Sequence, residues 1–532
     1  MKKNFLRLTM LCMAVSASFT TTRGENAPIL LSYDELYANA ANLPILNYES
    51  VSRADAFALA TSKYQAAPIS PALYDYNSDP DMEEGQVFYL EGGKTYYLDG
   101  NNELSKGLTL ATRPEDVADG KRARVICGIG EHETIWYGSQ WNYTYSFFML
   151  GSADIDGVGE VNMEKLAFYD IDFDNPEAVN HGDYMEGLGY STGNYFINMY
   201  SNGMPITLES LVMENCTFKR LVRGFIREQG AHRKTWNHVL IKNNLFYDCG
   251  YYNQGAGGYA WVAGSGANPV SNLYKDMQIV ENTFYDSPFP SFFEETRCDN
   301  WTGGAWNITF SNNTLINFNT RADGSIFKMR YLPDGSVYNV ENNLIVLTKQ
   351  DGDARELNMY GADIRETLGH VTLNFNNNWS TNDNLTNGQI FSSKAWTATS
   401  LSFYKLVRDG NATLNGTLEV NVADVSSTDL MVSPCPPHKA VTSTDRNMHR
   451  ADALDGTATT EYNVNLYFKD MDNDIYKNNV GAARWRTEPS TGISSVIQQT
   501  PNSDAIYTLS GHRVTGSLRP GIYIQNGRKV IK

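Results

Sequence analysis

The sequence has no hydrophobic run, beyond its first residues, that approaches the roughly 18 apolar residues of a membrane-spanning helix. It also lacks zinc-ligand spacings, a phosphate-binding loop, a nucleophile elbow and a His-Glu-x-x-His motif. Charged residues make up only 19% of the chain. A protein anchored by an internal transmembrane helix, and the enzyme classes that carry those motifs, are therefore not predicted.

Cysteine is scarce, and basic residues are outnumbered. The balance of 43 Lys and Arg against 60 Asp and Glu gives a net charge of −17, which repels nucleic acid. We therefore expect no nucleic-acid partner, and a local basic track for any anionic partner. The cysteines beyond the first twenty residues form no close pairs, so we predict small buried apolar residues and no disulfide framework. They are Cys127, Cys216, Cys249, Cys298 and Cys435.

The sequence does contain a short phrase that recurs between residues 160 and 380. A typical copy, Asn243-Asn-Leu-Phe246-Tyr-Asp248, follows the alternating apolar run Val239-Leu-Ile-Lys-Asn243. Period-two alternation indicates strands, and the i, i+3, i+4, i+7 apolar spacing of helical repeats is missing. The large apolar residue of the phrase falls at Phe168, Phe218, Phe246, Phe284, Leu315, Ile345 and Trp379.

Each copy fits one coil of a parallel β-helix, with a strand, an Asn-rich turn, a second strand and a loop of variable length. Asn tolerates the left-handed backbone of a sharp bend, and its amide can bond the amide of the next coil. Coils stacked about 4.8 Å apart then align Asn with Asn and Phe with Phe. We therefore predict an all-β fold, a right-handed parallel β-helix. The residues predicted to stack inside it are Phe218, Phe246, Phe284, Leu315 and Ile345.

The first residues have the order of an export signal. Lys2, Lys3 and Arg7 precede an apolar stretch from Leu8 to Val15, and small residues follow at 16–18. We predict a signal peptide over residues 1–17 and an exported protein.

Residues 18–84 are predicted to form a short helical cap. Helix is expected within residues 33–66, where Ser32-Tyr-Asp-Glu35 resembles a capping box, with a second piece near residues 53–60. A parallel β-helix leaves an open apolar end, so a cap at this position is expected on physical grounds.

From residue 85 the chain resembles a known family. Val87-Phe-Tyr-Leu-Glu-Gly-Gly-Lys-Thr-Tyr-Tyr-Leu98 is similar to the opening coils of secreted pectate-lyase-like β-helices from polysaccharide-utilisation systems, many of which have no assigned function. Gly481-Ala-Ala-Arg484-Trp485 is similar to that group's usual close, with Ala-Ala in place of Asp-Pro. We place the β-helix at 85–400 and its C-terminal end at 401–486.

A polar linker is expected over residues 487–502, followed by a small β module over 503–532. Ile506-Tyr-Thr-Leu-Ser-Gly511 and Gly521-Ile-Tyr-Ile524 resemble the C-terminal sorting domain of type IX (Por) secretion substrates. That resemblance implies the outer-membrane secretion machinery as a partner, and a cell-surface or extracellular location. A β module that merely caps the chain is the alternative.

Candidate site residues come from aligning strands that begin with a small residue and two apolar ones. Gly224-Phe-Ile-Arg227, Ser291-Phe-Phe-Glu294 and Ser325-Ile-Phe-Lys328 then point Arg227, Glu294 and Lys328 outward in one row. The row is a substrate groove or an ordinary ladder of salt bridges. Candidate catalytic residues are Lys328, Arg330 and Arg227, and candidate substrate-binding residues are Trp261, Tyr259 and Glu294.

The resembling lyases hold Ca²⁺ with acidic residues and use Lys or Arg as the base. The nearest acidic cluster is Asp170-Ile-Asp172-Phe-Asp174, which binds a cation or merely solvates a turn. We thus expect a monomer that binds acidic plant polysaccharide of the pectin class, with β-elimination of uronic-acid polymers as one outcome. A non-catalytic glycan-binding protein and a structural or adhesive surface protein are the alternatives. If the row is only a salt-bridge ladder, the site is expected in the 169–210 insertion near Tyr184, Tyr190 and Tyr195.

Overall fold

The structure is a computed structural model that divides into two compact units, residues 1–486 and 487–532. The predicted signal peptide and linker lie outside the described residues. Side chains are described where burial can be assigned, and the strands at 325–329, 356–360 and 506–531 are described as backbone. The described residues are 27–40, 60–98, 102–127, 136–137, 140–141, 146–151, 159–176, 195–199, 205–221, 224–228, 232–247, 249, 261–263, 273–285, 287, 289, 292–295, 303–316, 325–329, 331–346, 356–360, 366–367, 369–383, 390–391, 403–430, 473–486, 506–508, 522–525 and 528–531.

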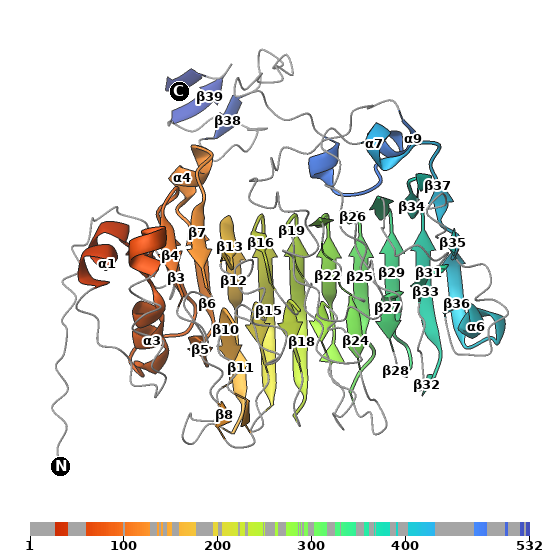
Figure 1. Cartoon of the computed structure of the whole chain (residues 1–532), viewed down its shortest axis with the longest axis horizontal. Coiled ribbons are helices and arrows are strands. Elements are labelled where there is room, and N and C mark those ends of the chain that lie inside the picture. Colours follow the sequence, from red (N-terminus) through yellow and green to blue (C-terminus); the bar gives the residue numbers. More distant parts are fainter. Residues whose placement is uncertain are drawn as a thin grey trace. The chain divides into compact units, whose positions relative to one another are not determined.

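The first unit consists of three large parallel sheets that the chain visits in a fixed order, moving over by one strand at each circuit (Figure 1). One circuit, for example, passes through β18, β19 and β20 and the next through β22, β23 and β24. The predicted all-β, parallel architecture is confirmed, and it is compatible with a β-helix. None of the described helices is long and apolar enough to cross a membrane.

Sheet 1 has thirteen strands. In order they are β1 (Ile29–Leu31), β3 (Gln86–Leu90), β6 (Leu108–Thr112), β12 (Leu166–Tyr169), β15 (Ile206–Glu214), β18 (Lys234–Lys242), β22 (Met277–Val280), β25 (Asn307–Ser311), β29 (Val337–Glu341), β33 (Val371–Asn376) and β36 (Ala412–Gly416), with β11 (Val161–Met163) paired to β15 and β21 (Leu273–Tyr274) paired to β18.

Sheet 2 has eleven strands and sheet 3 has nine. Sheet 2 comprises β2 (Ala67–Pro68), β4 (Thr95–Tyr97), β7 (Ala123–Ile126), β13 (Ile171–Asp174), β16 (Thr217–Lys219), β19 (Leu245–Tyr247), β23 (Thr283–Tyr285), β26 (Thr314–Ile316), β30 (Leu344–Val346), β34 (Trp379–Ser380) and β37 (Asn421–Val422). Sheet 3 comprises β5 (Asn102–Leu104), β10 (Phe148–Leu150), β14 (Ile197–Asn198), β17 (Ile226–Arg227), β20 (Val262–Ala263), β24 (Phe293–Glu295), β27 (Ser325–Met329), β31 (Glu356–Tyr360) and β35 (Ile390–Phe391).

Two short pairs of strands lie outside these sheets. The strands β28 (Tyr331–Leu332) and β32 (Glu366–Thr367) pair in parallel, and β8 (Trp136–Tyr137) and β9 (Gln140–Trp141) pair antiparallel.

The turn between sheets 1 and 2 uses two neighbouring residues. The first has a left-handed backbone, with φ between 51° and 58°, and is an Asn in most coils. From Asn244 onward the second is a buried Asn, and from Asn282 onward its amide oxygen accepts the backbone N–H of the Asn in the preceding coil, as from Asn244 to Asn282 at 3.0 Å and from Asn282 to Asn313 at 2.9 Å. The left-handed residues are Asp170, Asn215, Asn243, Glu281, Asn312, Asn342 and Asn377.

The predicted interior stack is confirmed. Phe218 lies 5.0 Å from Phe246, ring centre to ring centre, and Phe246 lies 4.7 Å from Phe284, both pairs with nearly parallel rings. Leu315 and Ile345 continue the register, and all five side chains are buried.

The first and last copies of the repeated phrase are out of register with the prediction. The residue that pairs with Phe218 is Phe173, whereas Phe168 lies one strand earlier, on β12. At the other end Ile345 pairs with Ser380, and Trp379 pairs with Leu344. The first copy has Asp at the left-handed position, so matching by the large apolar residue alone selected the wrong Phe.

Short helices pack at both ends of the stack. Leu36 of α1 and Leu73 and Tyr76 of α3 join the buried core, with the Tyr76 ring 5.4 Å from Phe88. The predicted first helix is present over Tyr33–Asn39, where Ser32 makes no capping hydrogen bond through its side chain, and residues 41–59 of the predicted range lie outside the described residues. The described helices are α1 (Tyr33–Asn39), α3 (Ser70–Ser78), α4 (Pro114–Ala118), α6 (Phe403–Arg408), α7 (Ser427–Leu430), α9 (Asp474–Lys477) and the 3-10 turn η4 (Ala483–Trp485).

Residues 473–486, here called the closing segment, return to the outer face of sheet 2. The backbone N–H of Ala482 donates to Thr314 Oγ1 at 2.8 Å, and the Trp485 indole N–H donates to Thr283 Oγ1 at 2.8 Å. This outer face is therefore a second, smaller core. Its buried residues are Leu245, Tyr247, Tyr285, Ile316, Leu344, Val346, Ala423, Leu430, Ile475, Val480, Ala482 and Trp485.

The second unit contains a three-stranded antiparallel sheet. Its strands are β38 (Ile506–Thr508), β39 (Ile522–Gln525) and β40 (Arg528–Ile531).

Candidate functional site

The predicted charged row exists in the backbone register of sheet 3. Arg227 pairs with Ala263, Ala263 with Glu294, and Glu294 with Lys328, across β17, β20, β24 and β27. In each of these strands, the residue one position earlier pairs with the matching residue of the next strand. The first of these earlier residues, Ile226, is fully buried. Because successive strand residues alternate between the two faces, the positions of the row have the opposite parity to the core-facing Ile226. The alignment of these strands from sequence is thus correct.

The prediction that the whole row faces solvent is wrong for Arg227. Its side chain is only 4% exposed, and its guanidinium lies over the Tyr195 ring, 5.6 Å from the ring centre. Tyr195 comes from the preceding coil and is itself fully buried. Arg227 therefore supports the strand from beneath a covering layer, and that cover could not be seen in the alternation of its own strand.

The prediction that Trp261 binds substrate at the surface is also wrong. Its indole is fully buried, stacked on Phe225 at 4.9 Å and edge-on to Phe246 at 5.4 Å. The sequence carried the signal, because Ala260-Trp261-Val262 repeats the small-apolar-apolar start used to align the other strands. Both apolar residues of that start point into the core at the bend.

The remaining predicted site residues are only partly described. Glu294 and Lys328 are placed by backbone register alone. Tyr259 and Arg330, with Tyr184 and Tyr190 of the long insertion, lie outside the described residues.

The three aspartates predicted to hold a cation do not fit that role. Asp174 is buried and pairs with Arg124 at 2.6 Å and, through Oδ1, with Arg220 Nε at 2.8 Å. Burial would raise the pKa of Asp174, but the two guanidinium groups hold it below its usual value. The carboxylate lone pairs that a cation would need are thus directed at arginines.

Of the other two carboxylates, Asp172 lies 3.5 Å from Arg122. Asp170 occupies the left-handed turn position, where burial raises its pKa. Arg484 of the closing segment is half-buried near Arg122 and Asp172, and desolvation lowers its pKa to about 10. Among the side chains that the structure describes, no group of His, Cys, Asp and Glu is arranged to hold a metal ion.

A buried titratable cluster that sequence reasoning missed lies directly behind Arg227. The Tyr274 hydroxyl donates to Glu228 at 2.5 Å, and the Lys234 ammonium donates to the carbonyl of His232 at 2.7 Å. All three ionisable side chains are fully buried. Burial lowers the pKa of Lys234 to about 8, with the Glu228 carboxylate opposing the shift. The cluster can hold or release a proton near neutral pH, but it is enclosed by core side chains.

One signal for this cluster was present in the sequence. Lys234 and Trp236 share the parity of the residues they pair with, Ile206 and Leu208, which face the core. A lysine at a core-facing position of a strand indicates a buried charged group. Such a charge destabilises the fold unless another group pairs with it.

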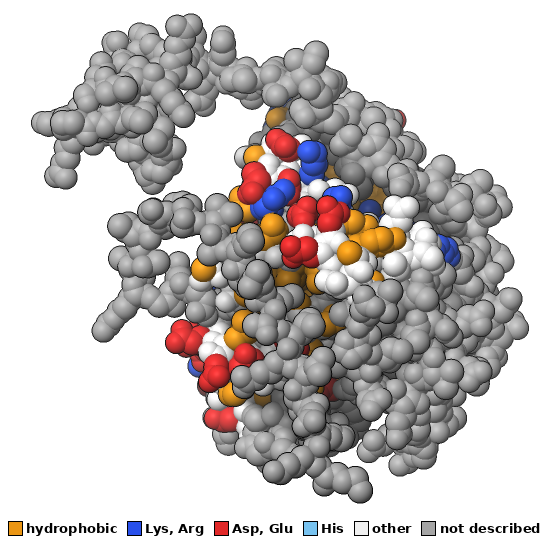
Figure 2. All heavy atoms as spheres, turned by 90° about the vertical axis from the view of Figure 1, so that its left-hand side faces the viewer, with side chains coloured by type: hydrophobic (Ala, Val, Ile, Leu, Met, Phe, Trp, Pro, Cys, Tyr) orange, Lys and Arg blue, Asp and Glu red, His pale blue; other side chains and the backbone are white. Residues whose placement is uncertain are grey.

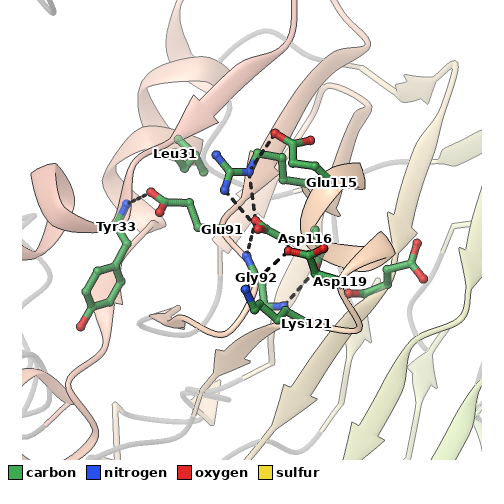
Figure 3. Close-up of polar contacts among 12 residues, drawn as sticks. Leu31, Tyr33, Glu91, Gly92, Glu115, Asp116, Asp119 and Lys121 are labelled. Carbon is green, nitrogen blue, oxygen red and sulfur yellow. Dashed lines mark hydrogen bonds and ion pairs between the residues drawn. The ribbon is translucent and has the colours of Figure 1, made fainter. Parts of the chain in front are cut away.

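A second charged group lies at the end of the stack that contains α1 and α3. Figure 2 shows basic and acidic side chains intermingled there among hydrophobic ones. In Figure 3, Asp116 accepts the backbone N–H of Gly92 at 2.8 Å, and its other bonds come from Arg113 at 2.9 Å and 3.1 Å. The hydrogen bond from Arg113, then that from Gly92, lowers the pKa of Asp116.

This group holds a turn in place. A Cβ at Gly92 would meet Lys121 Cβ at 2.9 Å, so only glycine fits beside Asp116. Arg113 also contacts Glu115 at 3.1 Å, and Lys121 contacts Asp119 at 3.6 Å. These charges pair with one another, and the two cations leave an excess of only one negative charge among the three carboxylates. The group therefore serves the turn and does not form a basic track for an anionic ligand.

The chain has no significant match among protein families, curated proteins or solved structures.

Proposed function

We propose that residues 85–400 form a right-handed parallel β-helix whose outward face on sheet 3 binds an acidic polysaccharide. The parallel sheets, visited in fixed order, support the fold, and α1 and α3 would cap its first coil. The observation that carries the functional proposal is the register that aligns Glu294 with Lys328 on the outward face of adjacent coils. Charged residues on neighbouring coils, about 4.8 Å apart, suit a polymer with repeating charges better than a small ligand.

Binding without catalysis is the form we favour. Arg227, one of the three predicted catalytic residues, lies beneath Tyr195, so it cannot approach a sugar ring. Lys328 and Arg330 would then pair with the uronate carboxylates of the polysaccharide. They would supply local positive charge on a protein whose net charge is −17. β-Elimination at the same row, with Lys328 taking the C5 proton, is the second candidate.

Affinity electrophoresis in gels containing polygalacturonate tests the proposal. The parent protein should be retarded, and Lys328→Ala should weaken binding by about 1.5–3 kcal/mol, the value of a charge-assisted hydrogen bond. Retardation should fall as salt rises, because exposed contacts are screened. Lys275→Ala is the matched control, since Lys275 is an exposed lysine of a sheet 1 turn.

The same samples separate binding from elimination. An unsaturated uronide, detected by its absorbance, should be absent from all samples if the row only binds. If Lys328 is the base, the product should form with the parent and with Lys275→Ala and be absent with Lys328→Ala. Equal retardation of parent, Lys328→Ala and Lys275→Ala would overturn the proposed role of the row.

We further propose that the protein is exported and reaches the cell surface or medium. The order of charges and apolar residues over 1–17 supports export, and the Gly-rich strands of 503–532 support delivery by type IX secretion.

A further inference from the structure

The outer face of sheet 1 carries a row of amide and hydroxyl side chains over its last four coils. Thr309 of β25 pairs with Asn339 of β29, then Asn374 of β33 and Asn415 of β36. These four strands are consecutive neighbours in the sheet (Figure 1). Asn415 is exposed, and the other three side chains are half-buried, as expected on a flat outward face. We call Thr309, Asn339, Asn374 and Asn415 the outer amide row.

The amides of this row bond one another in a single direction. Asn415 Nδ2 donates to Asn374 Oδ1 at 2.7 Å, Asn374 Nδ2 donates to Asn339 Oδ1 at 2.7 Å, and Asn339 Nδ2 donates to Thr309 Oγ1 at 3.1 Å. A primary amide has two N–H groups and two oxygen lone pairs. Each bond within the row uses one N–H group and one oxygen lone pair, and Asn339 Nδ2 also donates to Asn307 Oδ1 at 3.4 Å. The row therefore fixes the planes of the amides, and Asn374 and Asn415 each keep one N–H group that the row does not use.

The surroundings of the row are almost uncharged. On one side, Asn307 pairs with Val337, and Thr372 with Thr413. On the other side the one carboxylate among the described strand residues, Glu341, already accepts a bond from Asn376 at 2.9 Å. On a chain with a net charge of −17, this face is therefore suited to a neutral partner.

We propose that the outer amide row binds an extended, uncharged polysaccharide that runs across the strands. Neighbouring amides repeat about every 4.8 Å, close to the length of one sugar residue in an extended β-1,4-linked chain. Successive sugars can then lie over successive coils, with hydroxyl groups both donating to and accepting from the amides. Because each sugar of a β-1,4-linked chain is turned by half a turn relative to the one before, alternate sugars meet alternate coils in the same way. The proposal does not depend on the charged row, which lies on a different sheet.

The test uses the full chain in gels containing hydroxyethylcellulose, a neutral soluble β-1,4-glucan. The parent should be retarded. The double variant Asn339→Val, Asn374→Val should bind about tenfold more weakly, because it removes two ordered amides from the row. Valine suits an outward strand position, and thermal unfolding would check that the variant folds. Asn162→Val is the matched control, because Asn162 is an exposed Asn on β11 of the same sheet, far along the chain from the row.

A second variant and a second gel keep the outcome decisive. Asn374→Asp keeps the size of the side chain but cannot donate to Asn339, so it should also weaken retardation, whether or not the double variant folds. Retardation in polygalacturonate should be the same for all variants, which separates this face from the charged row. Equal migration of the parent with and without hydroxyethylcellulose, or parent-like retardation of Asn374→Asp, would overturn the proposal.

Discussion

At the scale of single residues, the stacking of coils supplies hydrogen-bond partners for the buried Asn side chains of the turn. The amide oxygen of Asn282 accepts the backbone N–H of Asn244, and its side-chain N–H donates to the Ile241 carbonyl at 2.8 Å. The ladder is neutral, so it avoids the desolvation cost of a charge. Lys234 is the contrasting case, because it carries a charge into the same interior.

Asn282→Ala should lower the free energy of unfolding by about 2–4 kcal/mol. The substitution leaves the buried N–H groups of Asn244 and the Ile241 carbonyl without their partners, and an unsatisfied buried group loses its full hydration. Denaturant midpoints of the full chain measure the change. Asn162→Ala, at an exposed Asn, should shift the midpoint little. A shift for Asn282→Ala no larger than that of the control would show that the ladder is not stabilising.

Lys234→Met should remove a rise of stability with pH. Because burial lowers the pKa of Lys234 to about 8, the unfolded chain binds this proton more tightly between about pH 8 and pH 10. Stability due to this group is thus lowest below pH 8 and rises through that window. The parent should gain about 1–2 kcal/mol, relative to Lys234→Met, between pH 7.5 and 9.5. Unfolding curves at the two pH values measure it, and identical pH slopes would contradict the assignment.

At the scale of elements, the closing segment shows how a short irregular stretch completes a sheet. Gly481 has a φ of 77°, and a Cβ there would lie 2.5 Å from Thr314 Oγ1. Glycine therefore lets the backbone approach sheet 2 closely enough for Ala482 to bond Thr314. The indole of Trp485 then fills the second core.

Trp485→Ala should destabilise the first unit by about 3–5 kcal/mol, the usual cost of a large cavity in a core. Its loss also leaves Thr283 Oγ1 without the indole bond. Unfolding midpoints and limited proteolysis of the full chain measure the effect. Arg486→Ala, which removes an exposed bond to Asn479, is the control and should change stability by less than about 0.5 kcal/mol. Similar protease resistance in both variants would argue against a stabilising role for the segment.

At the scale of the whole molecule, the chain has two compact units with different strand arrangements. The first is built from parallel sheets and the second from an antiparallel sheet of three strands. Such a division suits a protein in which one unit acts and the other directs delivery.

Deletion of residues 503–532 should leave the thermal unfolding of the first unit unchanged but keep the protein in the periplasm. The reason is that the second unit forms its own sheet, while the proposed sorting role resides in it. Cell fractionation in a host with type IX secretion measures the location, with the full chain as the control. Truncated protein in the medium or on the surface would refute the sorting role.

The sequence by itself determined the parallel coils, the turn residues and the interior stack. Those features are local: alternation assigns a strand residue to one face, and Asn at a bend satisfies the left-handed backbone. The repeated phrase alone thus suffices to place Phe218, Phe246 and Phe284 inside one column, where their strands pair in register. For the same reason, the strand register of the charged row was predictable from the sequence.

Only the tertiary structure decided what covers the outward side chains. Alternation places Arg227 and Asp174 on the outer face, but not beneath Tyr195 or between two arginines. Ala482 meets Thr314 across 168 residues of chain, and Tyr274 meets Glu228 from the next coil. The strands themselves follow from local chemistry, whereas the burial and charge of a site depend on segments that folding brings together from distant positions.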